Sequence, residues 1–206
     1  MCMNSIITIS RQYGSGGRFI ARKLAEKLGI PYYDNEIITM AAKESGYSEA
    51  IFEKAEQIST HSFLYSLSMF GSAEGLYGLP LADKVYLAQT EVIKKCANEG
   101  PCVIVGRCSD YVLNEYPNVL NFFIYSDEEH KVKRATQYYG LDPKKAAEEL
   151  RKKDKKRANY YNYYTNQRWG DAENYHLSLN SDAVGIEAAV DIIALFVKSH
   201  DELNNK

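Results

Sequence analysis

The stretch that decides the fold is residues 6–25, IITISRQYGSGGRFIARKLA. A short apolar run, Ile6 to Ile9, meets a glycine cluster, and the pattern of an amphipathic helix begins immediately afterwards. Glycines allow the backbone to turn its N–H groups inward, and the dipole of the following helix adds partial positive charge at the same place. The stretch therefore predicts a strand, a turn that holds phosphate, and a helix.

The turn departs from the ATP-binding P-loop pattern, which ends in Gly-Lys followed by a hydroxyl residue that holds magnesium. Gly17 stands at the lysine position, Arg18 follows it, and Phe19 replaces the hydroxyl residue. Arg18 is a candidate to reach the phosphates because a guanidinium group fits phosphate oxygens well. A tight turn without a ligand is the alternative interpretation. The expected phosphate-binding residues are Arg11, Gly14, Ser15, Gly16, Gly17 and Arg18.

Length and composition indicate one domain, residues 1–206, with a formal net charge of -2 and 45% apolar residues. No apolar run is long enough to cross a bilayer, the first residues lack the pattern of a secretory signal, and the charge gives no signal for nucleic acid. We therefore expect a cytoplasmic protein that binds neither membranes nor nucleic acid. The four cysteines include no C-x-x-C pair, so no zinc site is expected.

Apolar segments alternate with amphipathic ones along the chain. This alternation predicts an α/β fold with three layers, in which a parallel sheet of roughly five strands has helices on both faces. The expected strands are residues 6–9, 30–33, 102–105, 119–125 and 176–180. The expected helices are residues 18–28, 35–45, 48–58, 81–98, 126–139, 142 to beyond 164, and 186–198.

Three local signals refine this assignment. Ser126 and Glu129 have the spacing of a capping box at the start of a helix. Asp142 followed by Pro143 predicts a helix with aspartate at the N-cap and proline at its first position. Residues 59–79 mix glycine, serine and aromatic residues without a period, which favours a loop or broken helix over a cleft.

Four polar features follow four different expected strands. These are the glycine cluster, Asp34, Arg107 and Asp127. Ligands of parallel sheets bind beyond the carboxyl ends of the strands, so we expect the four features to meet at one rim of the sheet. Capping of the next helix would by itself account for Asp34 and for Asp127.

The order of these motifs resembles the P-loop nucleoside monophosphate kinases, and the chain is identified as a member of the cytidylate-kinase-like group. The resemblance spans nearly the whole chain and implies a P-loop NTPase-type fold with a helical lid. It also implies transfer of the γ-phosphoryl group of ATP, with Mg²⁺, to the phosphate or hydroxyl of a small acceptor. Its segments are the glycine turn, ARKLAEKLGIPYYD (21–34), VIVGR (103–107), FFIYSDEEHKVKRA (122–135), Asp154 with Arg157, and LSLNS (177–181).

The resemblance also implies roles for individual residues. Residues 35–80 would form an acceptor-side helical insertion, and residues 140–170 would form the lid. No metal ligand is firmly assigned, although Asp34 and Asp127 are candidates. The catalytic candidates are Arg18, Arg107, Asp154 and Arg157, and the acceptor-binding candidates are Asp34, Arg107 and Asp127.

Several departures leave alternatives open. Met40 stands where the family has an acceptor-binding arginine, and Cys108 replaces an aspartate, so the acceptor is cytidylate, another nucleotide or another phosphorylated small molecule. A catalytically silent nucleotide- or phosphate-binding regulatory protein is the second hypothesis. The basic run 151–157 forms either a solvated face or a lid surface that faces phosphate. The tyrosines at positions 160, 161, 163 and 164 pack within the fold, contact a second copy in a homodimer, or stack on a base.

Overall fold

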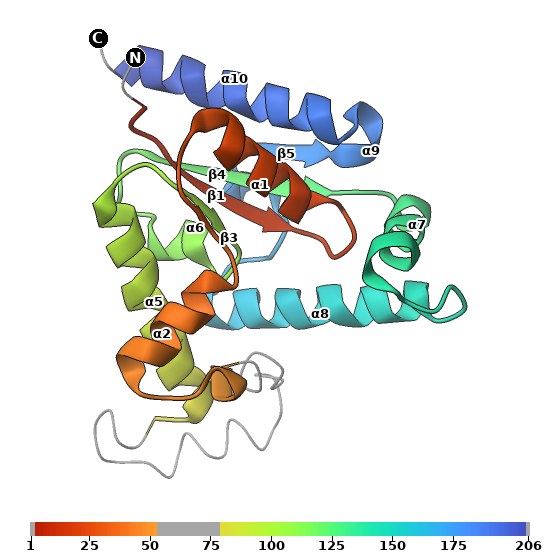
Figure 1. Ribbon diagram of the computed structural model, residues 1–206, viewed down its shortest axis with the longest axis horizontal. Helices are drawn as coiled ribbons and strands as arrows, with labels where there is room; N and C mark the ends of the chain where they lie inside the picture. The colour runs from red at the N-terminus through yellow and green to blue at the C-terminus, as the bar shows by residue number, and fades with distance from the viewer. Residues whose placement is uncertain (1–2, 53–78, 205–206) are drawn as a thin grey trace.

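The computed structural model describes residues 3–52 and 79–204 (Figure 1). A five-stranded sheet lies at its centre, in the order β2-β3-β1-β4-β5, and every neighbouring pair of strands is parallel. This confirms the predicted sheet. The strands are β1 (Ile6–Arg11), β2 (Tyr32–Tyr33), β3 (Val103–Val105), β4 (Val119–Tyr125) and β5 (Leu177–Asn180).

The central strand β1 is apolar because helices cover both of its faces. Ile7 and Ile9 pack into the core on one side of the sheet, whereas Ile6 packs into the core on the other. The register pairs Ile7 with Val103 of β3 and with Leu120 of β4. This register brings the end of β1 level with the end of β4, which positions the glycine turn.

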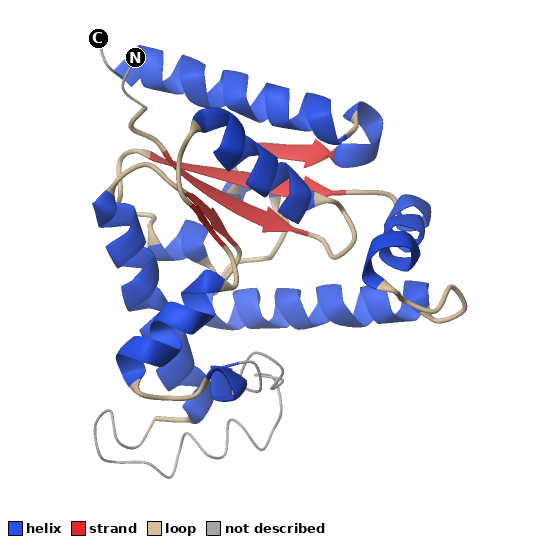
Figure 2. Cartoon of the chain, in the orientation of Figure 1, coloured by secondary structure: helices blue, strands red, loops and turns tan. Residues whose placement is uncertain are grey.

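Two helical layers enclose the sheet (Figure 2). On one side, α1 (Gly17–Leu28) packs against α10 (Ile186–Asn204) and the strands. On the other side, α2 (Glu36–Ser45) packs against α5 (Leu81–Glu99), next to the short helix α6 (Ser109–Val112). The remaining helices are α7 (Glu128–Tyr139), α8 (Ala146–Thr165), the 3-10 turn η2 (Ala172–Asn174) and α9 (Ser181–Val184).

The tyrosines of α8 pack this helix against α5. The ring of Tyr164 stacks on Tyr86 with ring centroids 4.0 Å apart, and its hydroxyl donates a hydrogen bond to Asp83. The hydroxyl of Tyr160 donates to Gln89, one turn further along α5. At these two positions the tyrosine cluster therefore packs within the fold, as one of the three interpretations predicted.

Two helices begin later than predicted, and the predicted capping box at one of them was wrong. Helix α7 has Asp127 at its N-cap and no side-chain capping bond, because the hydroxyl of Ser126 donates to Asp182 instead. Helix α8 begins at Ala146, three residues after the predicted first position, but Asp142 does cap the turn that leads into it: its carboxylate accepts the amide of Lys144 at 3.0 Å and its carbonyl accepts the amide of Ala146. Of the helix expected at 48–58, residues 49–52 are helical, residue 48 precedes the helix, and residues 53–58 lie outside the described residues. The prediction for 59–79 also falls almost entirely outside them.

In residues 3–52 and 79–204, no helix combines the length and apolar character needed to span a membrane.

Candidate active site

The glycine turn joins β1 to α1 at the carboxyl edge of the sheet. Gly14 and Gly16 have φ angles of +82° and +79°, in the left-handed region that other residues rarely adopt. A Cβ atom at Gly14 would lie 3.0 Å from the carbonyl oxygen of Lys131, and one at Gly16 would lie 2.5 Å from Ile186 Cδ1. The turn therefore requires glycine at both positions, for its conformation and for its close packing.

The turn keeps several amide groups available for an anion. The buried hydroxyl of Ser15 donates to the carbonyl of Gln12 and accepts the amide of Gly17. Within the described part of the chain, the amides of Gly14, Gly16 and Arg18 have no hydrogen-bond acceptor. A cavity of about 110 Å³ lies against this turn. Unsatisfied amides at a helix start attract phosphate, and this turn presents such amides next to a cavity.

Arg11, the last residue of β1, lies across the start of α1. A Cβ atom at Gly17 would lie only 2.6 Å from Arg11 Cβ, and a Cβ atom at Gly106 would lie 2.2 Å from Arg11 Nη1. The Arg11 side chain thus runs past Gly17 and ends beside Gly106. Burial, and secondly repulsion from Arg157, lower the pKa of Arg11 to about 9.

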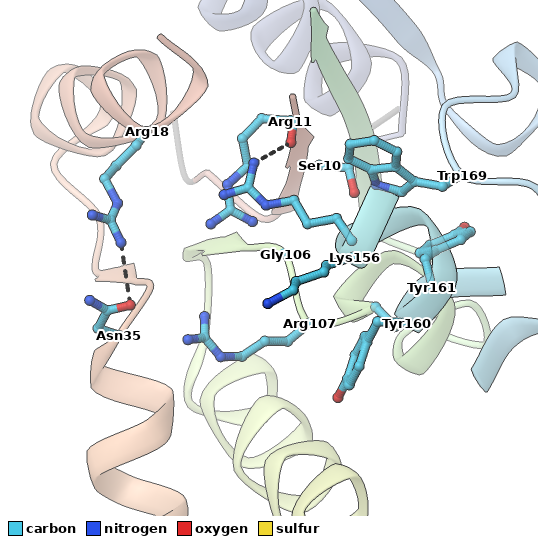
Figure 3. A pocket seen from close by; sticks show the side chains of 12 residues that line it. Ser10, Arg11, Arg18, Asn35, Gly106, Arg107, Lys156, Tyr160, Tyr161 and Trp169 are labelled. Carbon is cyan, nitrogen blue, oxygen red and sulfur yellow. Dashed lines mark hydrogen bonds between the residues drawn. The ribbon is translucent and has the colours of Figure 1, made fainter. Parts of the chain in front are cut away.

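Asp34, just after β2, is only 3% exposed and lies among three guanidinium groups. Its carboxylate oxygens are 2.5 Å from Arg18 Nε, 3.5 Å from Arg11 Nη2 and 3.6 Å from Arg107 Nη1. Burial alone would raise the pKa of Asp34, but the guanidinium groups outweigh it and hold that pKa below its ordinary value. Arg18 also donates to Asn35 at 3.3 Å, so it points along the start of α2 (Figure 3).

The backbone that presents Arg107 is in a disfavoured conformation. Arg107 and Cys108 both have φ of +55°, and among the described residues the only other non-glycine residue with positive φ is Asn166. Such a conformation costs on the order of 1–2 kcal/mol per residue and tends to occur at functional sites. The strain therefore coincides with the arginine that the resemblance assigns to the acceptor.

A larger cavity of about 250 Å³ lies next to the one at the glycine turn (Figure 3). Among the described residues that line it, five are cationic and none is a carboxylate. The two cavities share Arg11, Arg18 and Arg157. A concave site with this excess of positive charge concentrates anions. The lining residues are Ser10, Arg11, Arg18, Asn35, Gly106, Arg107, Cys108, Lys156, Arg157, Tyr160, Tyr161 and Trp169.

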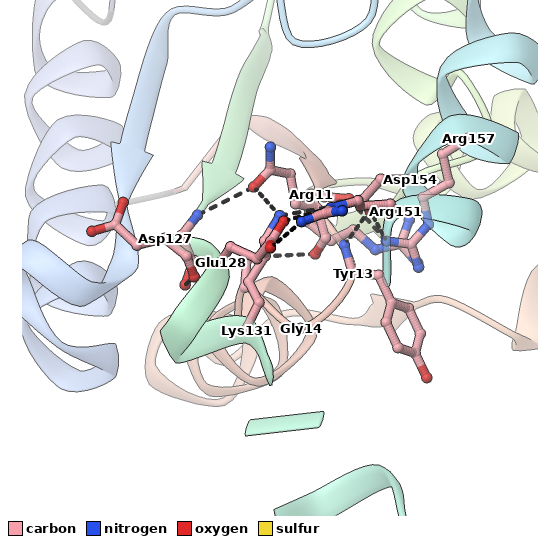
Figure 4. Close-up of polar contacts among 12 residues, drawn as sticks. Arg11, Tyr13, Gly14, Asp127, Glu128, Lys131, Arg151, Asp154 and Arg157 are labelled. Carbon is pink, nitrogen blue, oxygen red and sulfur yellow. Dashed lines mark hydrogen bonds and ion pairs between the residues drawn. The ribbon is translucent and has the colours of Figure 1, made fainter. Parts of the chain in front are cut away.

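Asp154 and Arg157 connect α8 to the glycine turn (Figure 4). Asp154 accepts the amide of Tyr13 at 2.6 Å and lies 3.4 Å from Lys131 Nζ, while Arg157 donates to the carbonyl of Arg11 at 3.0 Å. Burial raises the pKa of Asp154 and lowers the pKa of Arg157. Both residues meet the turn as the sequence suggested, but Asp154 bonds to a backbone amide and lines neither cavity.

Asp127 lines neither cavity and, unlike Asp34 and Asp154, makes no hydrogen bond or ion pair with the arginines or the glycine turn in the described part of the chain. It is exposed at the start of α7 and accepts the side-chain amide of Asn180 at 3.4 Å. Its own amide donates to Asp182 at 3.0 Å, and His130 lies beside the same two carboxylates. The structure brings Arg11, Arg18, Asp34, Arg107 and Arg157 together and leaves Asp127 at the neighbouring helix start.

Sequence reasoning did not single out Ser10, Lys156 or Trp169, which line the larger cavity. Lys156 stands within the basic run that was considered as a whole, and Trp169 is the single tryptophan of the chain. Trp169 packs edge-on against Phe123 of β4, with ring centroids 5.3 Å apart. The adjacency of Lys156 to Arg157 was a usable signal, whereas nothing local to Trp169 indicated its position.

The residues at the turn do not fit a magnesium ion held by protein side chains. Arg18, which directly follows the lysine position, pairs with Asp34, and Phe19, the next residue, stacks on Tyr139 with an interplanar angle of 7°. Asp34 is surrounded by guanidinium groups, which repel a cation. Magnesium prefers oxygen ligands and often binds through substrate phosphates with few protein ligands. No catalytic step is therefore derived from a metal held by this chain.

Several solved structures are similar to this chain in fold. A protein from Eubacterium ventriosum ATCC 27560, described as uncharacterized, is 30% identical, covers 95% of this chain and 99% of its own, and superposes with a TM-score of 0.70. Shikimate kinase from Bacteroides thetaiotaomicron is 14% identical, with coverage of 94% and 98% and a TM-score of 0.55. A gluconokinase from Sinorhizobium meliloti 1021 is also 14% identical, with coverage of 98% and 99% and a TM-score of 0.52.

At this level of identity, the last two structures establish the fold alone, which is that of the P-loop kinases. No curated protein sequence matches the chain. The model of the cytidylate kinase-like family matches residues 6–183, from β1 to α9. The chain therefore belongs to the cytidylate kinase-like family, with a P-loop that lacks the usual lysine and hydroxyl residues.

Proposed function

We propose that this protein is an ATP-dependent phosphotransferase of the nucleoside monophosphate kinase type that acts on a small anionic acceptor. The observation that supports this most directly is the pair of adjoining cavities that share Arg11, Arg18 and Arg157. One cavity follows the glycine turn and suits a chain of donor phosphates. The other is wider, cationic and partly aromatic, and suits an acceptor.

In this proposal, the γ-phosphoryl group leaves the β-phosphate oxygen of ATP and forms a new bond to an oxygen of the acceptor, so ADP is released. The amides of Gly14 and Gly16 hold the donor phosphates. Arg157 and Arg11 lie between the two cavities, where negative charge is transferred. Because phosphoryl transfer depends mainly on positioning and charge neutralisation, no proton-transfer residue is required for a phosphate acceptor.

The acceptor lies in the larger cavity in this proposal. Arg107 and Lys156 pair with its anionic group, and Tyr160 and Trp169 contact its uncharged part. Met40, which replaces the family arginine, packs against the apolar core that includes α2 and α5. This placement removes one phosphate contact and favours an acceptor that differs from cytidylate.

The proposal also assigns roles to two segments. Residues 140–170 act as the lid, which is supported by the contacts of Asp154 and Arg157 with the glycine turn. Residues 35–80 act as the acceptor-side insertion, which is supported by the contact between Asn35 and Arg18 at the edge of the larger cavity. Transfer of a label from ATP to acceptor, measured in variants of each segment, tests the two assignments.

The test is ADP formation from ATP and Mg²⁺ against a panel of acceptors. CMP, dCMP, UMP and AMP represent nucleotides, and shikimate and gluconate represent the acceptors named in the fold relatives. We expect one acceptor to stimulate ADP release, and Arg107→Ala to lower kcat/KM by about 100-fold or more. Arg22→Ala is the control, because Arg22 is 72% exposed on α1. ADP release that no acceptor stimulates would contradict the proposal.

A catalytically silent binding protein is the second candidate. Two observations favour it: the carboxylate of Asp154 already accepts one amide of the turn, and neither Arg18 nor Phe19 supplies the hydroxyl group of the ordinary pattern. Isothermal titration calorimetry separates the two candidates. ATP binding without turnover of any acceptor supports the silent protein, and transfer to any acceptor excludes it.

A further inference from the structure

We propose that Arg11 is the cation that binds the donor phosphates in this chain, in the place that lysine takes in an ordinary P-loop. The inference deepens the proposed function and rests on it for the reaction. The binding of polyphosphate by Arg11 does not depend on that reaction. It also explains why the lysine position holds glycine, which the sequence by itself presents as a plain loss.

Arg11 stands at a position that belongs to the P-loop pattern. The P-loop pattern has glycine at its first and sixth positions and lysine at its seventh. With Gly16 at the sixth position and Gly17 at the seventh, the first position falls on Arg11. This chain has therefore gained a long cationic side chain at the first position and lost one at the seventh.

The side chains at positions 11 and 17 would compete for the same space. A Cβ atom at Gly17 would lie 2.6 Å from Arg11 Cβ and 3.2 Å from Ile124 Cβ on β4. These Cβ atoms are fixed by the backbone, so no change of rotamer relieves the overlap. Positions 11 and 17 cannot both have a side chain in this turn. The ordinary pattern leaves the space to lysine at the seventh position, and this chain leaves it to Arg11.

The guanidinium group of Arg11 has a defined position. It lines both cavities and lies where a Cβ atom at Gly106 would overlap its Nη1 atom (Figure 3). Gly106 therefore provides the space at the tip of the side chain, as Gly17 does at its base. The backbone is fixed as well, because Arg157 donates to the carbonyl of Arg11.

The charges around the guanidinium group of Arg11 are mostly positive. Asp34 lies 3.5 Å from Arg11 Nη2, but its closest partner is Arg18 at 2.5 Å. Arg11 also faces Arg157, Arg107 and Arg18, which repel it. The guanidinium group thus has a cationic excess around it, and Arg11 lines the cavity at the glycine turn. A polyphosphate chain supplies the missing negative charge, and Arg11 is placed to contact it from both cavities.

The test uses isothermal titration calorimetry with inorganic tripolyphosphate, followed by ATP. Arg11→Met keeps the length of the side chain and removes its charge, and we expect affinity to fall about 10- to 100-fold, as for loss of a charged hydrogen bond. Arg22→Met, on the exposed face of α1, is the matched control and leaves affinity unchanged. Binding by Arg11→Met within threefold of the original protein would overturn the assignment.

The decisive variant exchanges the two positions. Gly17→Lys alone introduces the overlap with Arg11, and we expect a lower melting temperature together with at least tenfold weaker binding. The double variant Arg11→Gly with Gly17→Lys restores the ordinary pattern, and we expect it to recover both the melting temperature and an affinity within about fivefold of the original. If Gly17→Lys melts like the original protein, or if the double variant recovers neither property, the exchange is refuted.

The two proposals fail in different ways. If the protein binds tripolyphosphate through Arg11 but transfers phosphoryl to no acceptor, the proposed function is wrong and the role of Arg11 stands. If transfer occurs and Arg11→Met leaves both polyphosphate binding and the KM for ATP unchanged, the role of Arg11 is wrong and the function stands. Absence of tripolyphosphate binding by the original protein overturns the role of Arg11 directly.

Discussion

Replacing Arg11 with methionine should make the ligand-free protein more stable. Burial, and then repulsion from Arg157, lower the pKa of Arg11 to about 9. The folded state therefore holds this positive charge less favourably than the unfolded chain does. Methionine has a similar length, suits a buried position and removes the repulsion with the neighbouring arginines.

The size of this expected stabilisation follows from the lowered pKa of Arg11. The difference between about 9 and the ordinary 12.5 corresponds to a cost on the order of a few kcal/mol, at roughly 1.4 kcal/mol for each pH unit. Part of this is offset in the variant, because Asp34 loses one of its three guanidinium partners and keeps Arg18 at 2.5 Å. We expect a net gain of about 1–2 kcal/mol in the free energy of unfolding, which raises Tm by roughly 2–8 °C.

The pH dependence has a defined sign. The unfolded chain keeps the Arg11 proton to higher pH than the folded chain does. The loss of stability that the charged Arg11 causes in the original protein is therefore complete below pH 9 and diminishes as pH rises above 9. The Tm difference between Arg11→Met and the original protein should therefore be constant from about pH 6.5 to 8.5. Differential scanning calorimetry in a buffer free of phosphate and sulfate measures it, with Arg22→Met as the control. A Tm below that of the original protein would refute the electrostatic reasoning, because Arg11 would then be a stabilising residue.

Three further predictions concern neighbouring residues. Gly106→Ala places a Cβ atom 2.2 Å from Arg11 Nη1 and should weaken tripolyphosphate binding about tenfold in calorimetry. Unchanged affinity would mean that the Arg11 side chain does not need the space at Gly106 to bind phosphate. Asp110 is 5% exposed, accepts the Tyr161 hydroxyl, and has its pKa raised by burial. Asp110→Asn should therefore unfold in urea at pH 7 with stability equal to the original or up to about 1 kcal/mol greater, and this difference should narrow at acid pH as the folded Asp110 becomes protonated; a large loss of stability would show that the charge is needed. Tyr164→Leu removes the stacking on Tyr86 and the hydrogen bond to Asp83, and it should lower the free energy of unfolding in urea by about 1–3 kcal/mol. An unchanged urea midpoint would show that these contacts do not stabilise the fold.

The sheet and the glycine turn were predictable because their signals are local. Apolar runs such as those of β1 and β4 indicate strands covered on both faces, and alternation with helices then requires a parallel sheet. The position of Asp34 and Arg107 at the same rim followed from the same topology, since the carboxyl ends of parallel strands share one edge. Both parts of this reasoning need only the order of elements along the chain.

The path of Arg11 could not be predicted in this way. It depends on the register that sets Arg11 opposite Ile124 and on the space that Gly106 leaves on another strand connection. The wrong capping box at α7 has a similar cause. The hydroxyl of Ser126 is bonded by Asp182, which is 56 residues away, so a local spacing rule was overridden by a tertiary contact. Arg11 was already among the predicted phosphate-binding residues, but its place at the first position of the P-loop pattern was not connected with the missing lysine at the seventh.

The unfavourable features of the site share one explanation, which is the binding of a polyanion. Burial lowers the pKa of Arg11 and of Arg157, and the backbone at Arg107 is held in the left-handed region. Each of these costs free energy in the ligand-free protein, and none of them is needed to form the sheet or the helical layers. Proteins keep such conflicts where function requires them. A bound polyanion relieves the electrostatic part of the cost, so the same contacts that destabilise the free protein provide affinity for phosphate groups. The glycine at the lysine position is then part of this arrangement, because it is the space that allows Arg11 to take part in it.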